Sequence, residues 1–195
     1  MDELNTGDLV LFHGEGNIYS EGIEFVTHSD WSHCAMVVRN PRFTCPPLKG
    51  LYIWESGQEN TLNPETNRKN IGVQFTSLVE KMQTYEGTAA YRKLLGPLPS
   101  QEQLSNIHHI VHAKPYNYWI PDYLSIILKK LWKPKPTDRY YWCSSLVARV
   151  WQACGVIPEE TDWNAITPAD LAGSVECKSP YLLGPVTRLV NKYNT

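Results

Sequence analysis

Two residues with nucleophilic and basic chemistry, Cys143 and His33, each begin a segment that could hold them rigidly. Cys143 opens a run, 143–153, in which apolar residues recur with the period of a helix. His33 precedes the apolar run 34–38, which is typical of a central strand. At a helix N-terminus, unpaired backbone N–H groups and the macrodipole favour a thiolate, so we expect a lowered pKa for Cys143. With His33 as base and counter-ion, this pair predicts the nucleophile of a thiol hydrolase or acyltransferase.

Glu55 is the natural third member of this site, because it follows His33 in the next predicted strand, 51–56. A carboxylate there could fix the imidazole tautomer and stabilise the imidazolium. Each of the three residues also has a structural interpretation. Cys143 could be a buried core cysteine, His33 could bond to a backbone carbonyl, and Glu55 could be a solvated strand end. The functional interpretation depends on the three residues together.

Three further residues could complete a cleft around the thiol. The backbone N–H groups of Cys143 and Ser144 could stabilise a developing oxyanion. Tyr116 and Trp142 could line the cleft with aromatic walls, although aromatic side chains beside a nucleophile also serve in packing. Cys154 stands at the far end of the same predicted helix, where the dipole opposes a thiolate, so we expect it in the core.

The hydrophobic pattern predicts strands in the N-terminal half and helices in the C-terminal half. The strands are expected over 7–12, 34–38, 51–56, 72–78, 89–95 and 183–190. Helices are expected over 20–28 (one or two turns), 78–83, 121–131 and 143–153. Two more helices are expected to begin at the capping box 100–103 and at Thr167. The segments 40–50 and 57–70 are predicted to be loops, and 133–136 is predicted to be a linker. The helix after the capping box should bury Leu104, Ile107, Ile110 and Val111. Together these elements predict one α+β domain, 1–195.

Composition excludes several classes of function. The chain has 195 residues, 42% of them hydrophobic and 19% charged, and a net charge of −2, which gives no electrostatic reason to bind nucleic acid or an anionic membrane. No apolar run approaches the roughly 20 residues of a membrane span. The polar, acidic start MDELNT is unlike a signal peptide. Five cysteines without a CxxC pair favour free thiols in a reducing, cytoplasmic compartment.

A competing cluster consists of His108, His109 and His112. On a helix, His108 and His112 would share a face and could chelate a metal, as a metal-dependent hydrolase would require. Neither an HExxH motif nor an evident third ligand accompanies them, so we interpret the three histidines as a solvated helix face. The predicted chemistry at Cys143 needs no metal or organic cofactor.

The order of several motifs resembles the circularly permuted NlpC-type papain-like proteins, and the YiiX-type branch with its poxvirus relatives in particular. The motifs are GDLVLF at 7–12, SDWSHCAMVV at 29–38, IWE at 53–55, YWCSSLV at 141–147, KPYNY at 114–118 and TPADL at 167–171. The resemblance implies an antiparallel sheet or barrel packed against the helix that carries the cysteine. It also implies a catalytic triad in which Cys143 is the nucleophile, His33 the base and acid, and Glu55 the orienting residue.

The chain departs from this family pattern at Ser145, where the YiiX-type branch usually has Glu after Cys-Ser, so a contact made by that glutamate is missing. Three functions stay open. The first is a cysteine peptidase or amidase that acts on a peptide or acylated substrate. The second is a lipid-directed acyltransferase or acylhydrolase resembling the lecithin:retinol acyltransferase relatives, whose Asn-Cys-Glu-His-type motif is absent here. The third is an inactive binding module.

Overall fold

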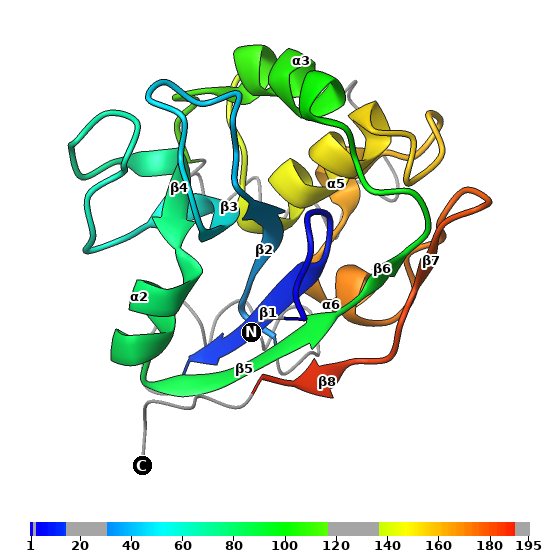
Figure 1. Ribbon diagram of the computed structural model, residues 1–195. Helices are drawn as coiled ribbons and strands as arrows, with labels where there is room; N and C mark the ends of the chain where they lie inside the picture. Colours follow the sequence, from blue (N-terminus) through cyan, green and yellow to red (C-terminus); the bar gives the residue numbers. More distant parts are fainter. Residues whose placement is uncertain (2, 15–30, 117–136, 190–195) are drawn as a thin grey trace.

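A six-stranded antiparallel sheet forms the centre of the molecule, as the computed structural model shows (Figure 1). The structure describes residues 1, 3–14, 31–116 and 137–189. The sheet has the order β4-β3-β2-β1-β5-β8. Its strands are β1 (Leu9–Gly14), β2 (His33–Arg39), β3 (Leu51–Gln58), β4 (Ile71–Ser77), β5 (Gly87–Arg92) and β8 (Thr187–Arg188), and a separate pair joins β6 (Leu94–Leu95) to β7 (Leu182–Leu183). This mixed architecture with an antiparallel sheet agrees with the expected α+β class.

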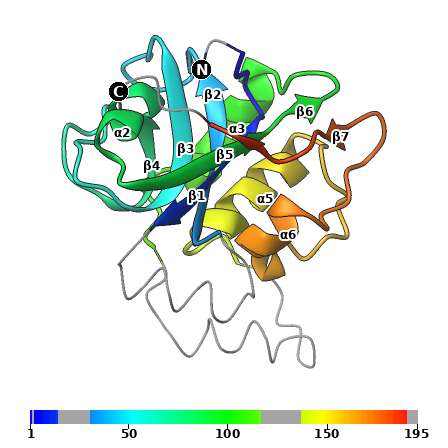
Figure 2. The same ribbon diagram turned by 90° about the horizontal axis from the view of Figure 1, so that it is seen from below.

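Helices cover both faces of the sheet (Figure 2). On one face, α3 (Gln101–Val111) and α5 (Cys143–Ala153) pack against the side chains that the strands turn toward them, such as Met36 and Trp54. On the other face, α2 (Leu78–Thr84) packs over Ala35 and Ile53. The short helices η1 (Trp163–Ala165) and α6 (Pro168–Ala172) follow α5. Since side chains alternate along a strand, each central strand serves both layers of the core.

Helix α5 begins at Cys143, as the sequence predicts, and its start is fixed by local contacts. The Ser145 hydroxyl accepts a hydrogen bond from the Trp142 backbone N–H at 3.0 Å, which satisfies a donor just before the helix. The expected apolar side of the helix is buried, and Gly155, with a φ of +74°, lies just beyond its end. Leu146 packs with the sheet side chains in the same core. The first residue of α5 is therefore held firmly beside the sheet.

Two expectations about the elements are wrong. In α3, Ile110 is 41% exposed, whereas His108 is 7% exposed and takes its place in the buried face. The reason is helical geometry, because Leu104, Ile107, His108 and Val111 follow the i, i+3, i+4, i+7 spacing of one face. The single strand expected over 183–190 is instead two short strands, β7 and β8. Pro185 lies between them and has no N–H for a ladder.

Several other expectations stay predictions, because they fall on residues that the structure does not describe. The helices over 20–28 and 121–131, the linker at 133–136 and the last residue of 183–190 lie outside the described residues.

The strand expected over 89–95 is present as β5 and β6, separated at Lys93. The organisation of 1–195 as a single domain is not tested. Within the described part of the chain, no helix is long and apolar enough to pass through a bilayer.

Candidate active site

The three residues singled out by the sequence meet at one end of the sheet. His33 is the first residue of β2, Glu55 lies within β3, and Cys143 is the first residue of α5. His33 Nε2 lies 2.7 Å from Glu55 Oε2, and the His33 and Cys143 side chains are hydrogen-bonded to each other. The imidazole therefore bridges the carboxylate and the thiol.

Glu55 is buried completely, and β3 continues for three residues beyond it. The alternative that Glu55 is a solvated strand end is therefore wrong. Burial by itself would raise the pKa of Glu55, but the charge of Lys81 and the hydrogen bond with His33 outweigh burial and lower that pKa to about 2. Glu55 is thus a carboxylate at every pH at which His33 could act as a base.

The pKa of Cys143 is held well below its ordinary value of 9.0. The largest cause is a hydrogen bond with the Cys34 side chain; burial opposes it, and the hydrogen bond and charge of His33 add to it. Burial alone would lower the pKa of His33, but its hydrogen bonds with Cys143 and Glu55 raise it to about 9. Both shifts favour a thiolate–imidazolium pair at neutral pH.

Cys34 is a residue of this site that the sequence interpretation missed. It is completely buried, and both burial and its hydrogen bond with Cys143 raise its pKa well above 9.0. Cys34 therefore keeps its proton and donates it in a hydrogen bond to the Cys143 sulfur. Strand alternation could have revealed this role, because residue 34 shares the face of Met36, which packs against α5.

Lys81 of α2 is a second residue that the sequence interpretation missed. Its ammonium group lies 2.9 Å from Glu55 Oε2, bonds to Glu59 Oε1 as well, and sits 4.9 Å from the centre of the Phe12 ring. Burial would lower the pKa of Lys81, but the charges of Glu55 and Glu59 raise it. A signal was present in the sequence, because Lys81 follows Leu78 by three residues and so shares its buried face.

The three further cleft candidates are near the start of α5, and their roles stay predictions; they are Ser144, Tyr116 and Trp142. The Ser144 hydroxyl donates a hydrogen bond to the Ile166 carbonyl oxygen at 2.7 Å. Tyr116 pairs with Tyr141 in an isolated bridge, and Trp142 is 3% exposed. Cys154 lies in the core as expected, and burial raises its pKa to about 12.

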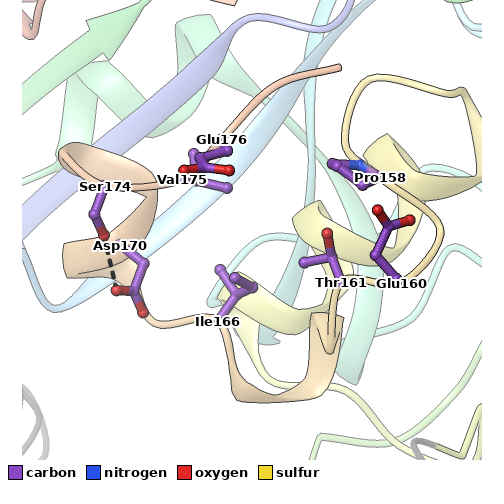
Figure 3. Close-up of a pocket in the computed structure, with 8 residues that line it drawn as sticks. All are labelled: Pro158, Glu160, Thr161, Ile166, Asp170, Ser174, Val175 and Glu176. Carbon is purple, nitrogen blue, oxygen red and sulfur yellow. Dashed lines mark hydrogen bonds between the residues drawn. The ribbon is translucent and has the colours of Figure 1, made fainter.

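A hollow of about 310 Å³ lies close to Ser144, and Figure 3 shows the residues that line it. They include Ile166, whose carbonyl oxygen holds Ser144, and Asp170, which accepts a hydrogen bond from Ser174 at 3.0 Å. Neither Cys143, His33 nor Glu55 is among them. This hollow is therefore not where a bound acyl group would meet the thiol.

Two groups of described residues bring histidine and carboxylate ligand atoms within 4.8 Å of one another. In the first, His33, Glu55 and Glu59 converge, but the Lys81 ammonium group already supplies the cation between the two carboxylates. In the second, Glu65 joins His108 and His112. The interpretation of the histidines as a solvated face is thus wrong for His108, and Glu65 is a third candidate ligand that the sequence did not reveal.

Comparisons with known proteins add little to this geometry. No family model and no curated protein sequence matches the chain. Among solved structures, a similar chain is the crystal structure of metalloprotein YiiX from Escherichia coli O157:H7 (DUF1105). The two chains are 20% identical over 97% of this chain and 98% of that one, with a TM-score of 0.44. A likeness of this degree carries no argument about function.

Proposed function

We propose that this protein is a cysteine-dependent hydrolase that cleaves an amide, ester or thioester through a thioacyl intermediate. One observation carries the proposal: His33 bonds to buried Glu55 on one side and to Cys143 on the other. A carboxylate, an imidazole and a thiol in that sequence of contacts form the arrangement used by cysteine nucleophiles.

The first half-reaction would begin from the thiolate of Cys143. Its sulfur attacks the carbonyl carbon, a C–S bond forms, and the carbonyl oxygen takes the negative charge. The imidazolium of His33 then gives its proton to the leaving amine, alcohol or thiol as the bond to that group breaks. Because Nε2 is engaged by Glu55, Nδ1 is the nitrogen that exchanges the proton. The products are a thioester on Cys143 and a neutral imidazole.

The second half-reaction would use the neutral imidazole as a base. His33 takes a proton from water, the resulting hydroxide attacks the thioester, and the C–S bond breaks to return the thiolate and the acid product. The Glu55 carboxylate stabilises the imidazolium that forms in each half-reaction. Lys81 in turn keeps Glu55 charged, because it is the largest influence that lowers the pKa of that carboxylate.

The start of α5 would stabilise the oxyanion. The first intrahelical hydrogen bond runs from the Leu146 N–H to the Trp142 carbonyl oxygen at 3.1 Å, so the N–H groups of Cys143 and Ser144 precede the hydrogen-bonded ladder. Backbone donors in that position are oriented before substrate arrives, which is the condition for strong oxyanion stabilisation.

The proposal includes the permuted papain-like fold as its structural frame. Its support is the order of the elements, since the strands bearing His33 and Glu55 precede the helix bearing Cys143, together with the antiparallel sheet that packs against that helix. Ser145 bears on the inactive alternative, a binding module. Its hydroxyl completes a local contact at the helix start, so the residue is accommodated without disturbing Cys143.

The direct test looks for the acyl enzyme itself. The protein is incubated with amide, ester and thioester model compounds and with detergent-dispersed phospholipid, and intact and peptide mass spectra are recorded. We expect an acyl mass increase on Cys143, no turnover by Cys143→Ala, and a smaller loss of rate in Glu55→Gln than in His33→Ala. Acylation from phospholipid alone would favour the lipid-directed acyltransferase.

Cys45→Ala is the matched control, because Cys45 is an exposed cysteine. It should retain the rate of the wild type. Full activity of Cys143→Ala on a substrate that the wild type turns over would overturn the proposal. A wild-type protein that forms no adduct with any of the four compounds would make the binding module the better account.

A further inference from the structure

We propose that Glu65, His108 and His112 form a binding site for one divalent transition-metal ion of the zinc type. The site would lie on the face of β3 opposite Glu55, because His108 contacts the ring of Trp54, the strand neighbour of Glu55. The site shares no residue with the Cys143, His33 and Glu55 cluster, so the inference does not depend on the proposed hydrolase activity.

The distances suit three ligands of one small ion. His108 Nε2 lies 2.9 Å from Glu65 Oε1, and His112 Nδ1 lies 3.5 Å from Glu65 Oε2. The three ligand atoms lie within 4.8 Å of one another. Zinc–ligand bonds of about 2.0–2.2 Å in a tetrahedron place neighbouring ligand atoms roughly 3.3–3.6 Å apart. Small rotations of the side chains would bring all three atoms to that spacing.

The orientation of His108 distinguishes a metal site from a simple hydrogen bond. Its Nε2 is buried and has no aligned hydrogen-bond partner among the residues that the structure describes, although Glu65 Oε1 is only 2.9 Å away. A ring N–H that donates to a carboxylate points along the line between the two atoms. Two ligands of one ion instead aim their lone pairs at a shared third point. A close approach without hydrogen-bond alignment therefore fits a pair of metal ligands.

The surroundings of Glu65 also call for a cation. The Glu65 side chain is only 4% exposed, and among the described residues its ion pairs are with the two histidines. The rings of Phe43, Trp54 and Phe75 pack around His108, with centroids 5.3 to 6.0 Å away. A carboxylate in such a setting is costly unless it is paired or binds a metal. A divalent ion would supply the positive charge that imidazole ligands, which bind metals through a lone pair, do not.

The ligand set selects the class of metal. Two imidazole nitrogens and one carboxylate oxygen are the donors that zinc uses in sites with three protein ligands, where water takes the fourth position. The His112 side chain is 41% exposed, which leaves a path for the ion and room for that water. Calcium and magnesium prefer sites built only from oxygen.

Metal binding here would join two parts of the chain that are distant in sequence. Glu65 lies in the segment between β3 and β4, whereas His108 lies in α3 and His112 caps its end. An ion held by both would fasten that segment to the helix and stabilise the folded state by mass action. The first measurable consequence of the site is therefore a gain in the stability of the folded state.

The test is a titration of the full chain with Co²⁺, whose absorption reports its ligands, followed by displacement with Zn²⁺. We expect one ion per chain and a spectrum without thiolate-to-cobalt charge transfer, which separates this site from the five cysteines. His112→Ala and Glu65→Gln should each weaken binding by more than about tenfold. His109→Ala is the matched control, because His109 is exposed on the same helix and should bind as the wild type does.

Thermal unfolding gives the second readout. At a Zn²⁺ concentration about a hundredfold above Kd, Tm should rise in the wild type and in His109→Ala but not in His112→Ala. Because the His112 side chain is partly exposed, its alanine variant should fold, which circular dichroism would verify. Failure to bind Co²⁺, a thiolate band in the spectrum, or binding that survives His112→Ala would overturn the inference.

Discussion

The thiolate of Cys143 is stabilised by two neighbours of different kinds. Cys34 contributes a hydrogen bond from a thiol that stays protonated, and His33 contributes both a hydrogen bond and a positive charge. Burial opposes both neighbours. At the scale of single residues, the reactivity of the site should therefore depend on Cys34 as well as on the expected triad.

Replacement of Cys34 tests this dependence. Cys34→Ala removes the hydrogen-bond donor and should raise the pKa of Cys143, so that alkylation of the Cys143 thiol requires a higher pH. Cys34→Ser keeps a donor of similar size and should restore most of the wild-type profile. The measurement is the rate of iodoacetamide labelling against pH. Identical profiles for the alanine variant and the wild type would show that Cys34 serves only in packing.

In the proposed hydrolase, the charge of His33 would set the upper pH limit of activity. Its pKa is raised to about 9, and the leaving group needs the imidazolium as a proton donor. Activity should therefore persist up to that pH and fall as pH rises through about 9. In Glu55→Gln, loss of the carboxylate should lower the pKa of His33 and move this decline to lower pH. A pH–rate profile of both proteins checks this, and an unchanged upper limb in the variant would contradict it.

At the scale of elements, two polar clusters lie on opposite faces of β3. Glu55 faces α2 and Lys81, whereas the adjacent Trp54 faces His108 of α3. The alternation of side chains along the strand produces this separation. Helix α2 is only seven residues long, yet it supplies the buried cation of the site. Its placement is therefore as important for Glu55 as that of the strand.

Removal of the Lys81 charge tests this role of α2. Lys81→Met removes the ammonium group that pairs with the buried Glu55 carboxylate, and should cost about 3–5 kcal/mol in the free energy of unfolding. The double variant Lys81→Met, Glu55→Gln should recover much of that loss. Chemical denaturation measures both. A loss of the same size in the double variant would show that Lys81 acts through packing.

The same pair predicts a dependence of stability on acid. The pKa of Glu55 falls from 4.5 to about 2 on folding, so its contribution to stability is complete above about pH 4.5 and is lost as pH falls toward 2. In Glu55→Gln this part of the acid dependence should be absent.

At the scale of the whole molecule, the features that local patterns determine were predictable. The periods of the hydrophobic residues located the central strands and α5, and the positions of Cys143 and His33 at element starts pointed to two residues that the fold brings together. Glu65 and Lys81 were not identified as partners, because they meet His108 and Glu55 only through the packing of distant segments. The burial of His108 in the place predicted for Ile110 shows the same limit, because the prediction assumed that the apolar residue is buried and the polar one exposed.

The most direct test of the central claim needs no substrate. The rate of iodoacetamide alkylation is measured at each cysteine as a function of pH, by peptide mass spectrometry, in the wild type and in His33→Ala. We predict that Cys143 reacts rapidly below about pH 7, well under the ordinary cysteine pKa of 9.0, and that His33→Ala loses this reactivity. If Cys143 reacts as a free or buried thiol in both proteins, the thiolate–imidazolium pair does not exist and the proposed mechanism is wrong.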